Sequence, residues 1–151
     1  MAKFIQHQLF YPHPPEIVWE YLTDPELMAL WLMKSEFRPV VGHEFQFRTK
    51  PIADLDFDGV FYCEVLEVVP FKRLSYSWRF GPGDARPLNN SIVNWTLTEK
   101  DNGTELLLVH NGFEKEVYML PIFGSMEEGW LKNMHKIQQL LNTTTNGTAP
   151  A

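Results

Sequence analysis

The sequence contains a single cysteine, Cys63, so the chain cannot form a disulfide within itself. Proteins without disulfides are typical of the reducing interior of the cell. The first ten residues carry one lysine and no long apolar run, which argues against a signal peptide. We therefore expect a cytoplasmic protein. Because Cys63 lies between Tyr62 and Glu64 with no neighbouring cation, we expect it to be a packed, unreactive thiol.

Long apolar runs and basic clusters are also missing. No apolar stretch approaches the roughly 20 residues of a membrane-spanning helix. The net charge is -6, and the arginines and lysines are scattered along the chain. Proteins that bind nucleic acid or anionic membranes gather positive charge on one surface. These absences argue against membrane insertion and against nucleic acid as a partner.

The residue patterns of metal sites and of nucleophilic enzymes are absent as well. There is no His-x-x-x-His pair and no Gly-x-Ser-x-Gly elbow. Asp54, Asp56 and Asp58 alternate before Gly59, but a calcium loop would place a glutamate where Val65 stands. We predict no metal, no cofactor and no covalent catalysis.

Aromatic residues, in contrast, are abundant, with five Trp and eleven Phe among 151 residues. Rings of this size either pack into a dense core or line a cavity. The length fits one domain. We expect that domain to span residues 1–141, followed by a flexible tail of Thr, Asn, Gly and Pro over residues 142–151.

Hydrophobic periodicity predicts an α+β domain with six strands and three helices. Alternation of apolar and polar residues predicts the strands, and Pro15 and Pro25 each stand at a position typical of the first helical residue. The expected elements are a strand over 3–10, helices over 15–22 and 25–31, strands over 45–49, 59–69, 74–80, 93–98 and 104–112, and a helix over about 124–141.

The last helix carries one continuous apolar stripe. Met126, Trp130, Met134, Ile137 and Leu141 are spaced four, four, three and four residues apart, which is the period of an α-helix. We predict that this stripe packs against a sheet, with His135 facing outward.

Two segments and several turns carry a resemblance to a known family. The segments are residues 14–25 (PPEIVWEYLTDP), followed by Trp31, and residues 67–78 (EVVPFKRLSYSW). Gly103-Thr104, Gly112-Phe113 and Gly129-Trp130 complete the pattern. Over about residues 5–141 the chain resembles the activator of heat-shock-protein-90 ATPase-like family, within the SRPBCC or START-like superfamily.

This resemblance implies a helix-grip fold, in which a curved antiparallel sheet wraps around the long C-terminal helix and often leaves an apolar cavity. On the strand over 104–112, we place Leu106 and Leu108 inside because Glu105 should face solvent. The side chains expected to line the cavity are Phe45, Phe47, Tyr76, Trp78, Trp95, Leu108, His110, Trp130 and Met134.

His110 is the polar residue of greatest interest in this set. It could orient a ligand or act as a general acid or base, since imidazole titrates near neutral pH. The alternative is a buried histidine that is hydrogen-bonded to its neighbours.

Three functions remain open. The first is binding of a small hydrophobic or amphipathic ligand, which we favour. The second, implied by the family name, is a co-chaperone-like interaction with a chaperone or other protein. The third is a polyketide cyclase or aromatase-like activity, with His110 and either Tyr76 or Tyr62 as candidates.

Overall fold

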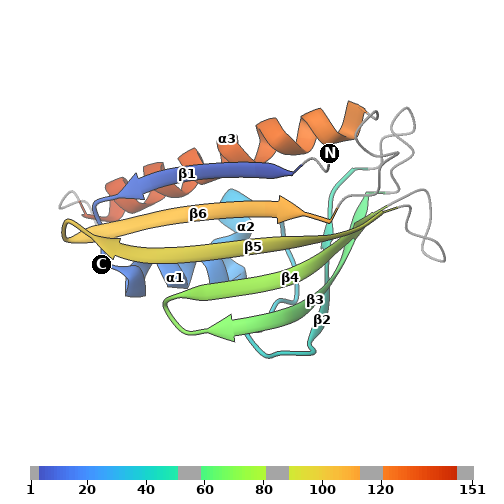
Figure 1. Ribbon diagram of the computed structural model, residues 1–151, viewed down its shortest axis with the longest axis horizontal. Coiled ribbons are helices and arrows are strands. Elements are labelled where there is room, and N and C mark those ends of the chain that lie inside the picture. The colour runs from blue at the N-terminus through green and yellow to red at the C-terminus, as the bar shows by residue number, and fades with distance from the viewer. Residues whose placement is uncertain (1–3, 51–58, 81–88, 113–120, 146–151) are drawn as a thin grey trace.

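The computed structural model describes residues 4–50, 59–80, 89–112 and 121–145 (Figure 1). The element order confirms the predicted α+β domain with six strands and three helices. The elements are β1 (Ile5–Tyr11), α1 (Pro15–Thr23), α2 (Pro25–Trp31), β2 (Glu44–Arg48), β3 (Val60–Val69), β4 (Arg73–Phe80), β5 (Asn89–Lys100), β6 (Gly103–Asn111) and α3 (Pro121–Thr145).

The six strands form one antiparallel sheet in the order β1-β6-β5-β4-β3-β2, and the helices lie on one of its faces (Figure 1). This is the helix-grip arrangement. The predicted orientation of β6 is confirmed, because Leu106 and Leu108 are buried while Leu107 and Val109 are only half-buried. A strand alternates its side chains between the two faces, so the core lies between the sheet and the helices.

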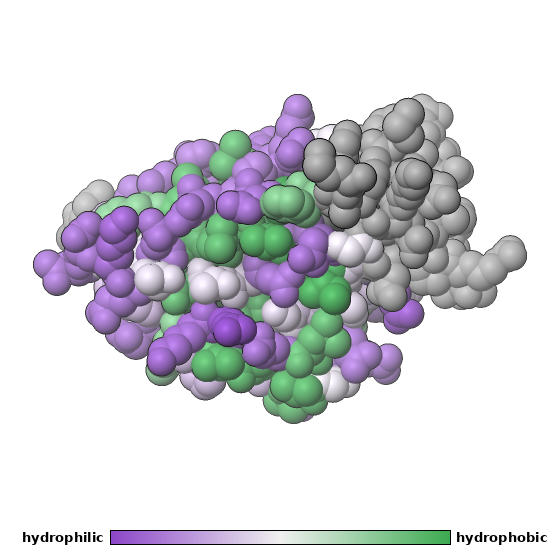
Figure 2. Space-filling model, in the orientation of Figure 1, coloured by the Kyte–Doolittle hydropathy of each residue, from purple (hydrophilic) through white to green (hydrophobic). Residues whose placement is uncertain are grey.

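The opposite face of the sheet, seen in Figure 2, mixes hydrophilic and apolar side chains. Leu66 and Ile92 are exposed there. Arg79 also lies on this face, but its Nε is buried and has no hydrogen-bond partner among the described residues.

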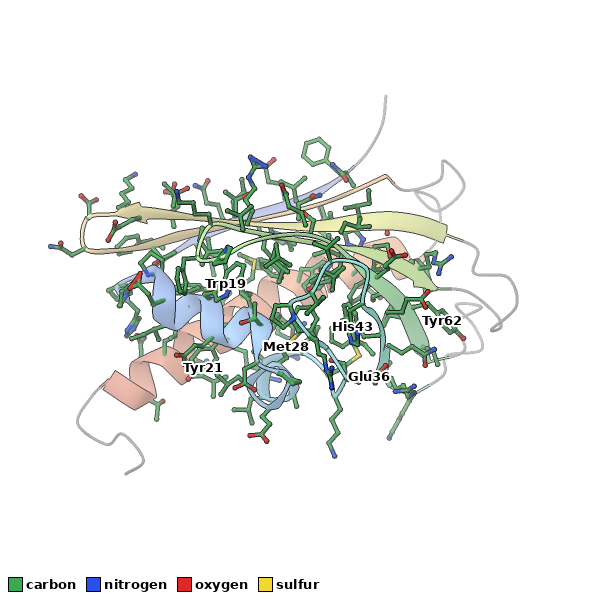
Figure 3. The ribbon with its side chains drawn as sticks, turned by 90° about the horizontal axis from the view of Figure 1, so that it is seen from below. Trp19, Tyr21, Met28, Glu36, His43 and Tyr62 are labelled. Atoms are coloured by element: carbon green, nitrogen blue, oxygen red, sulfur yellow. The ribbon has the colours of Figure 1, made fainter. Side chains whose placement is uncertain are left out.

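The helices α1 and α2 form a compact pair beneath the sheet (Figure 3). Asp24 separates them: its backbone N–H donates to Glu20 O, and its side chain accepts from the Glu26 N–H at 2.9 Å. The Trp31 indole N–H then donates to Tyr21 O at 2.7 Å. A side-chain cap followed by proline starts α2, as the sequence predicts.

Helix α3 presents the predicted stripe to the core, and all five of its apolar side chains are buried. The helix is longer than predicted, since it begins at Pro121 and ends at Thr145. Its last turn is polar and lacks the apolar periodicity on which the prediction relied. This turn is instead held by hydrogen bonds, from the His13 ring to Asn142 Oδ1 at 3.2 Å and from Thr143 Oγ1 to Gln139 O at 2.8 Å. No described helix is both long and apolar enough to cross a membrane.

Strand β2 forms one edge of the sheet, and the side chain of Glu36 covers part of that edge. Glu36 Oε1 accepts from the Gln46 N–H at 2.7 Å, and Glu36 Oε2 lies 3.4 Å from Arg48 Nη1. One backbone donor at this edge is therefore already satisfied within the chain.

The residues of the turn between β5 and β6 meet two different requirements, an unusual backbone angle and close packing. Asp101 and Asn102 take φ values of 50° and 63°, as a tight hairpin turn requires. Gly103 instead allows close contact: a Cβ there would lie 2.5 Å from Tyr11 O and 2.6 Å from Phe10 Cζ.

Replacing Gly103 with alanine should therefore destabilise the protein by about 1–3 kcal/mol, the usual range for overpacking. The matched control is Gly129→Ala in α3, where a Cβ meets nothing within 4 Å. Alanine there should stabilise the helix by about 0.5–1 kcal/mol. Urea unfolding measures both free energies, and equal effects of the two variants would contradict the packing argument.

Candidate functional site

The nine side chains predicted to line a cavity are all buried beneath the sheet, eight of them as members of one hydrophobic core and His110 as a buried polar residue. They come from β2, β4, β5, β6 and α3, so the fold brings together residues from Phe45 to Met134. The sequence thus identified the inner face of the sheet correctly.

Aromatic rings make a continuous layer between α3 and the far strands. The Trp130 ring from α3 lies 5.1 Å from Trp78 and 5.6 Å from Trp95, centroid to centroid. Trp78 in turn lies 4.4 Å from Phe61 on β3 and 5.5 Å from Phe47 on β2. These distances are those of favourable ring pairs.

Phe61 and Phe37 also belong to this layer and were not predicted from the sequence. Phe61 lies on the inner side of β3, and the alternation of that strand could have identified it. Phe37 lies in the segment between α2 and β2, where no helix or strand periodicity indicates which side chains face the core. Its ring packs 5.0 Å from Phe45 and 6.2 Å from Tyr76.

His110 is fully buried at the centre of this layer, and protein groups occupy both ring nitrogens. Trp130 Nε1 donates to His110 Nδ1 at 3.0 Å. His110 Nε2 lies 2.7 Å from Ser91 Oγ, and the Ser91 hydroxyl donates its hydrogen to Trp78 O at 2.8 Å. Since that hydroxyl has only one hydrogen, it must accept from His110. The imidazole is therefore neutral, with its proton on Nε2.

The Ser91–His110 pair is not arranged as a nucleophile and its base. A base would accept the serine hydrogen at Nε2, which requires the proton to move to Nδ1. In that tautomer the Nδ1–H would face the Trp130 N–H, donor against donor. The geometry therefore matches the alternative of a histidine paired within the core. Tyr62, one of the residues considered with His110 for catalysis, lies beside Arg79 on the outer side of the sheet.

Burial controls the titration of the site. It lowers the pKa of His110 from 6.5 to about 3. It also raises the pKa values of Tyr76 and Cys63, so all three groups are uncharged at neutral pH. Within the described ranges, no group of three or more acidic, histidine or cysteine side chains is placed to hold a metal ion. The loop with Asp54, Asp56 and Asp58 lies outside those ranges.

Three depressions on the surface are lined by described residues. A groove of about 550 Å³ lies beside the β3–β4 turn at Phe71, and one of about 330 Å³ lies over Ser77 and Ile92. The smallest, about 190 Å³, touches Phe45 next to Glu36. None of the other eight predicted cavity residues lines these three depressions.

The neutral His110 makes stability depend on pH. The unfolded chain binds a proton at this residue as pH falls through 6.5, whereas the folded protein does so only near 3. The contribution of the neutral His110 to the free energy of unfolding is therefore complete above pH 6.5 and is lost as pH falls toward 3. We expect the free energy of unfolding to drop by about 2 kcal/mol from pH 8 to pH 5 through this group.

Chemical denaturation at a series of pH values measures this drop. The variant His110→Gln should lose that part of the pH dependence, and His135→Gln, at an exposed position on α3, should keep it. If the two variants show the same pH profile, His110 does not carry the effect.

Comparisons with known proteins agree with this architecture. Residues 12–142 match the family model of activator of Hsp90 ATPase homolog 1-like proteins. The chain is similar to protein MLL2253 of Mesorhizobium loti, with 36% identity over 94% of this chain and 98% of that one, and a TM-score of 0.81. No curated protein matches the chain in sequence.

More distant structures share the fold alone. CalU16 of Micromonospora echinospora is 21% identical over 98% of this chain and 82% of that one, with a TM-score of 0.69. The Aha1 dimer of Colwellia psychrerythraea is 17% identical over 90% of this chain and 93% of that one, with a TM-score of 0.71. From the family model and the relative at 36% identity, the chain belongs to the family of activator of Hsp90 ATPase homolog 1-like proteins.

Proposed function

We propose that the protein binds a small hydrophobic or amphipathic molecule between the inner face of the sheet and α3. Its fold is of the kind found in ligand-binding and polyketide cyclase-like domains in general. The residues that would line the site are the nine buried side chains from Phe45 to Met134 that were identified from the sequence.

The observation that carries this proposal is the way α3 meets the sheet. Of all the strands, β1 at the sheet edge has the most extensive backbone approach to α3. Toward β5 and β4, large rings such as Trp95, Trp130 and Trp78 bridge the space instead. An apolar molecule entering this region would meet aromatic walls, and burying about 200 Å² of its surface would be worth about 5 kcal/mol before the cost of association.

In this proposal His110 is one of the lining residues and positions the walls, while protein groups occupy both of its ring nitrogens. Its two ring nitrogens join Trp130 to Ser91, and Ser91 continues to the Trp78 carbonyl. A ligand that took over one of these nitrogens would have to break a buried hydrogen bond, which costs free energy.

A protein partner is the second candidate, and one surface feature favours it. Phe71 is 45% exposed and takes a φ of 68°, which is uncommon for a bulky residue. The centroid of its ring lies 6.1 Å from that of the Trp19 ring, and Phe71 borders the 550 Å³ groove. An aromatic side chain held in this way at a turn is a reasonable anchor for another protein.

Matched tryptophan substitutions test the ligand proposal. Leu108 faces inward and Leu107 outward on the same strand, so Leu108→Trp fills the interior while Leu107→Trp does not. The neutral fluorescent probe N-phenyl-1-naphthylamine should bind the wild type saturably at one site and raise its melting temperature. Leu107→Trp should bind it equally well, and Leu108→Trp should bind it at least tenfold more weakly.

Circular dichroism checks that both variants fold, because an extra ring in a core can cost about 1–3 kcal/mol. Leu108→Ala is a further control that removes volume and should keep binding. If the wild type fails to bind the probe, or if both tryptophan variants bind it equally, the interior is not the binding site.

A further inference from the structure

We propose that the interior selects neutral ligands that carry a hydrogen-bond acceptor, such as a ketone, ester or quinone carbonyl, and that the indole N–H of Trp78 anchors this group. This inference rests on the proposed ligand-binding function and names the chemical class of the ligand.

Most buried side-chain donors of the core already have acceptors. The indole N–H groups of Trp31, Trp130 and Trp95 donate to Tyr21 O, His110 Nδ1 and Tyr76 Oη. The Ser91 hydroxyl donates to Trp78 O, and the Tyr11 hydroxyl donates to Met134 O at 2.7 Å.

Trp78 is an exception. Its side chain is 2% exposed, and its Nε1 has no hydrogen-bond partner among the described residues. Leaving a buried donor unpaired is costly, so such groups are rare and call for an explanation. The neighbouring rings of Phe61 and Phe47 carry no acceptor atom, and the indole nitrogen of Trp130 is a donor only. The acceptor nitrogen of the neighbouring His110 ring, Nδ1, is already taken by Trp130, and Trp78 Nε1 makes no hydrogen bond to the neighbouring Tyr76.

A second hydrogen-bond donor without an acceptor lies on the same strand. Tyr76 lies two residues before Trp78 on the inner side of β4, and its hydroxyl oxygen accepts from Trp95. No described residue accepts the hydrogen of that hydroxyl. No buried side-chain acceptor in the described part of the chain is left unpaired. The core therefore has hydrogens to donate and no matching oxygens, and a ligand oxygen would correct this imbalance.

The acceptor should be uncharged. Among the described residues, no charged side chain is buried in the core. The imidazole of His110 is held neutral by its partners, and Arg79 lies on the alternate, outer side of β4. A carboxylate entering this space would lose its hydration without gaining a cation, which strongly disfavours binding.

Two naphthalenes of equal shape test the inference by calorimetry. 2-Acetylnaphthalene carries a ketone, and 2-isopropenylnaphthalene replaces the ketone oxygen with a methylene group. Both should bind the wild type, and the ketone should bind about three- to tenfold more tightly, as expected of one neutral hydrogen bond. 2-Naphthoate, with a charge at the same position, should bind more weakly than either.

The matched variant replaces Trp78 with 3-benzothienylalanine, which keeps the bicyclic ring but has sulfur in place of N–H. The ketone should then bind no more tightly than the hydrocarbon, whose affinity should stay unchanged. The same replacement at Trp31, whose N–H donates to Tyr21 O, should leave the preference for the ketone intact.

The ligand-free protein provides an independent measurement. Replacement at Trp78 removes an unpaired donor and should leave the melting temperature unchanged or raise it, whereas replacement at Trp31 breaks a hydrogen bond and should lower it. A lower melting temperature for the Trp78 variant alone would overturn the inference.

The outcomes separate the two proposals. If neither naphthalene binds the wild type, the ligand-binding function fails and this inference fails with it. If both bind with equal affinity, the pocket stands and the acceptor selection is wrong. If the ketone preference survives in the Trp78 variant, another donor is the anchor.

Discussion

The structure depends on a short chain of hydrogen bonds through the core. It runs from the Trp130 indole on α3 to His110 on β6, then to Ser91 on β5, and ends at the Trp78 carbonyl on β4. Each group in this chain has a partner for the hydrogen it gives, which is the condition for burying polar groups without a large cost. This series of hydrogen bonds joins the long helix to three adjacent strands. It therefore sets how far the helix stands from the sheet and how the rings between them are oriented.

Much of the fold follows from local patterns. The alternation of Leu106, Leu108 and His110, with Glu105 placed outside, was sufficient to orient β6. The apolar stripe of α3 gave its buried face. The ends of elements were harder to predict, because the last turn of α3 is held by side chains such as Asn142, whose partner His13 is far away in sequence.

The central site could be predicted only in part. Sequence placed His110 and Trp130 inside, but their pairing depends on strand register. Trp78 lies opposite Ser91, and Val93 lies opposite His110, which puts the histidine and serine side chains in reach of each other across neighbouring strands. No periodicity reveals such an alignment. The same is true of Trp78, whose unpaired indole is visible only once every neighbouring acceptor has been located.

The carboxylate of Glu36 has a consequence beyond its own hydrogen bond. An open sheet can grow by accepting a strand from another molecule, and β2 is one of the places where this growth would begin. With the Gln46 N–H already occupied and a charged pair of Glu36 and Arg48 alongside it, an incoming strand would have to displace internal bonds before it could form its own. Pairing of another strand at this edge therefore carries an added cost, and the carboxylate of Glu36 protects β2 at the position of Gln46.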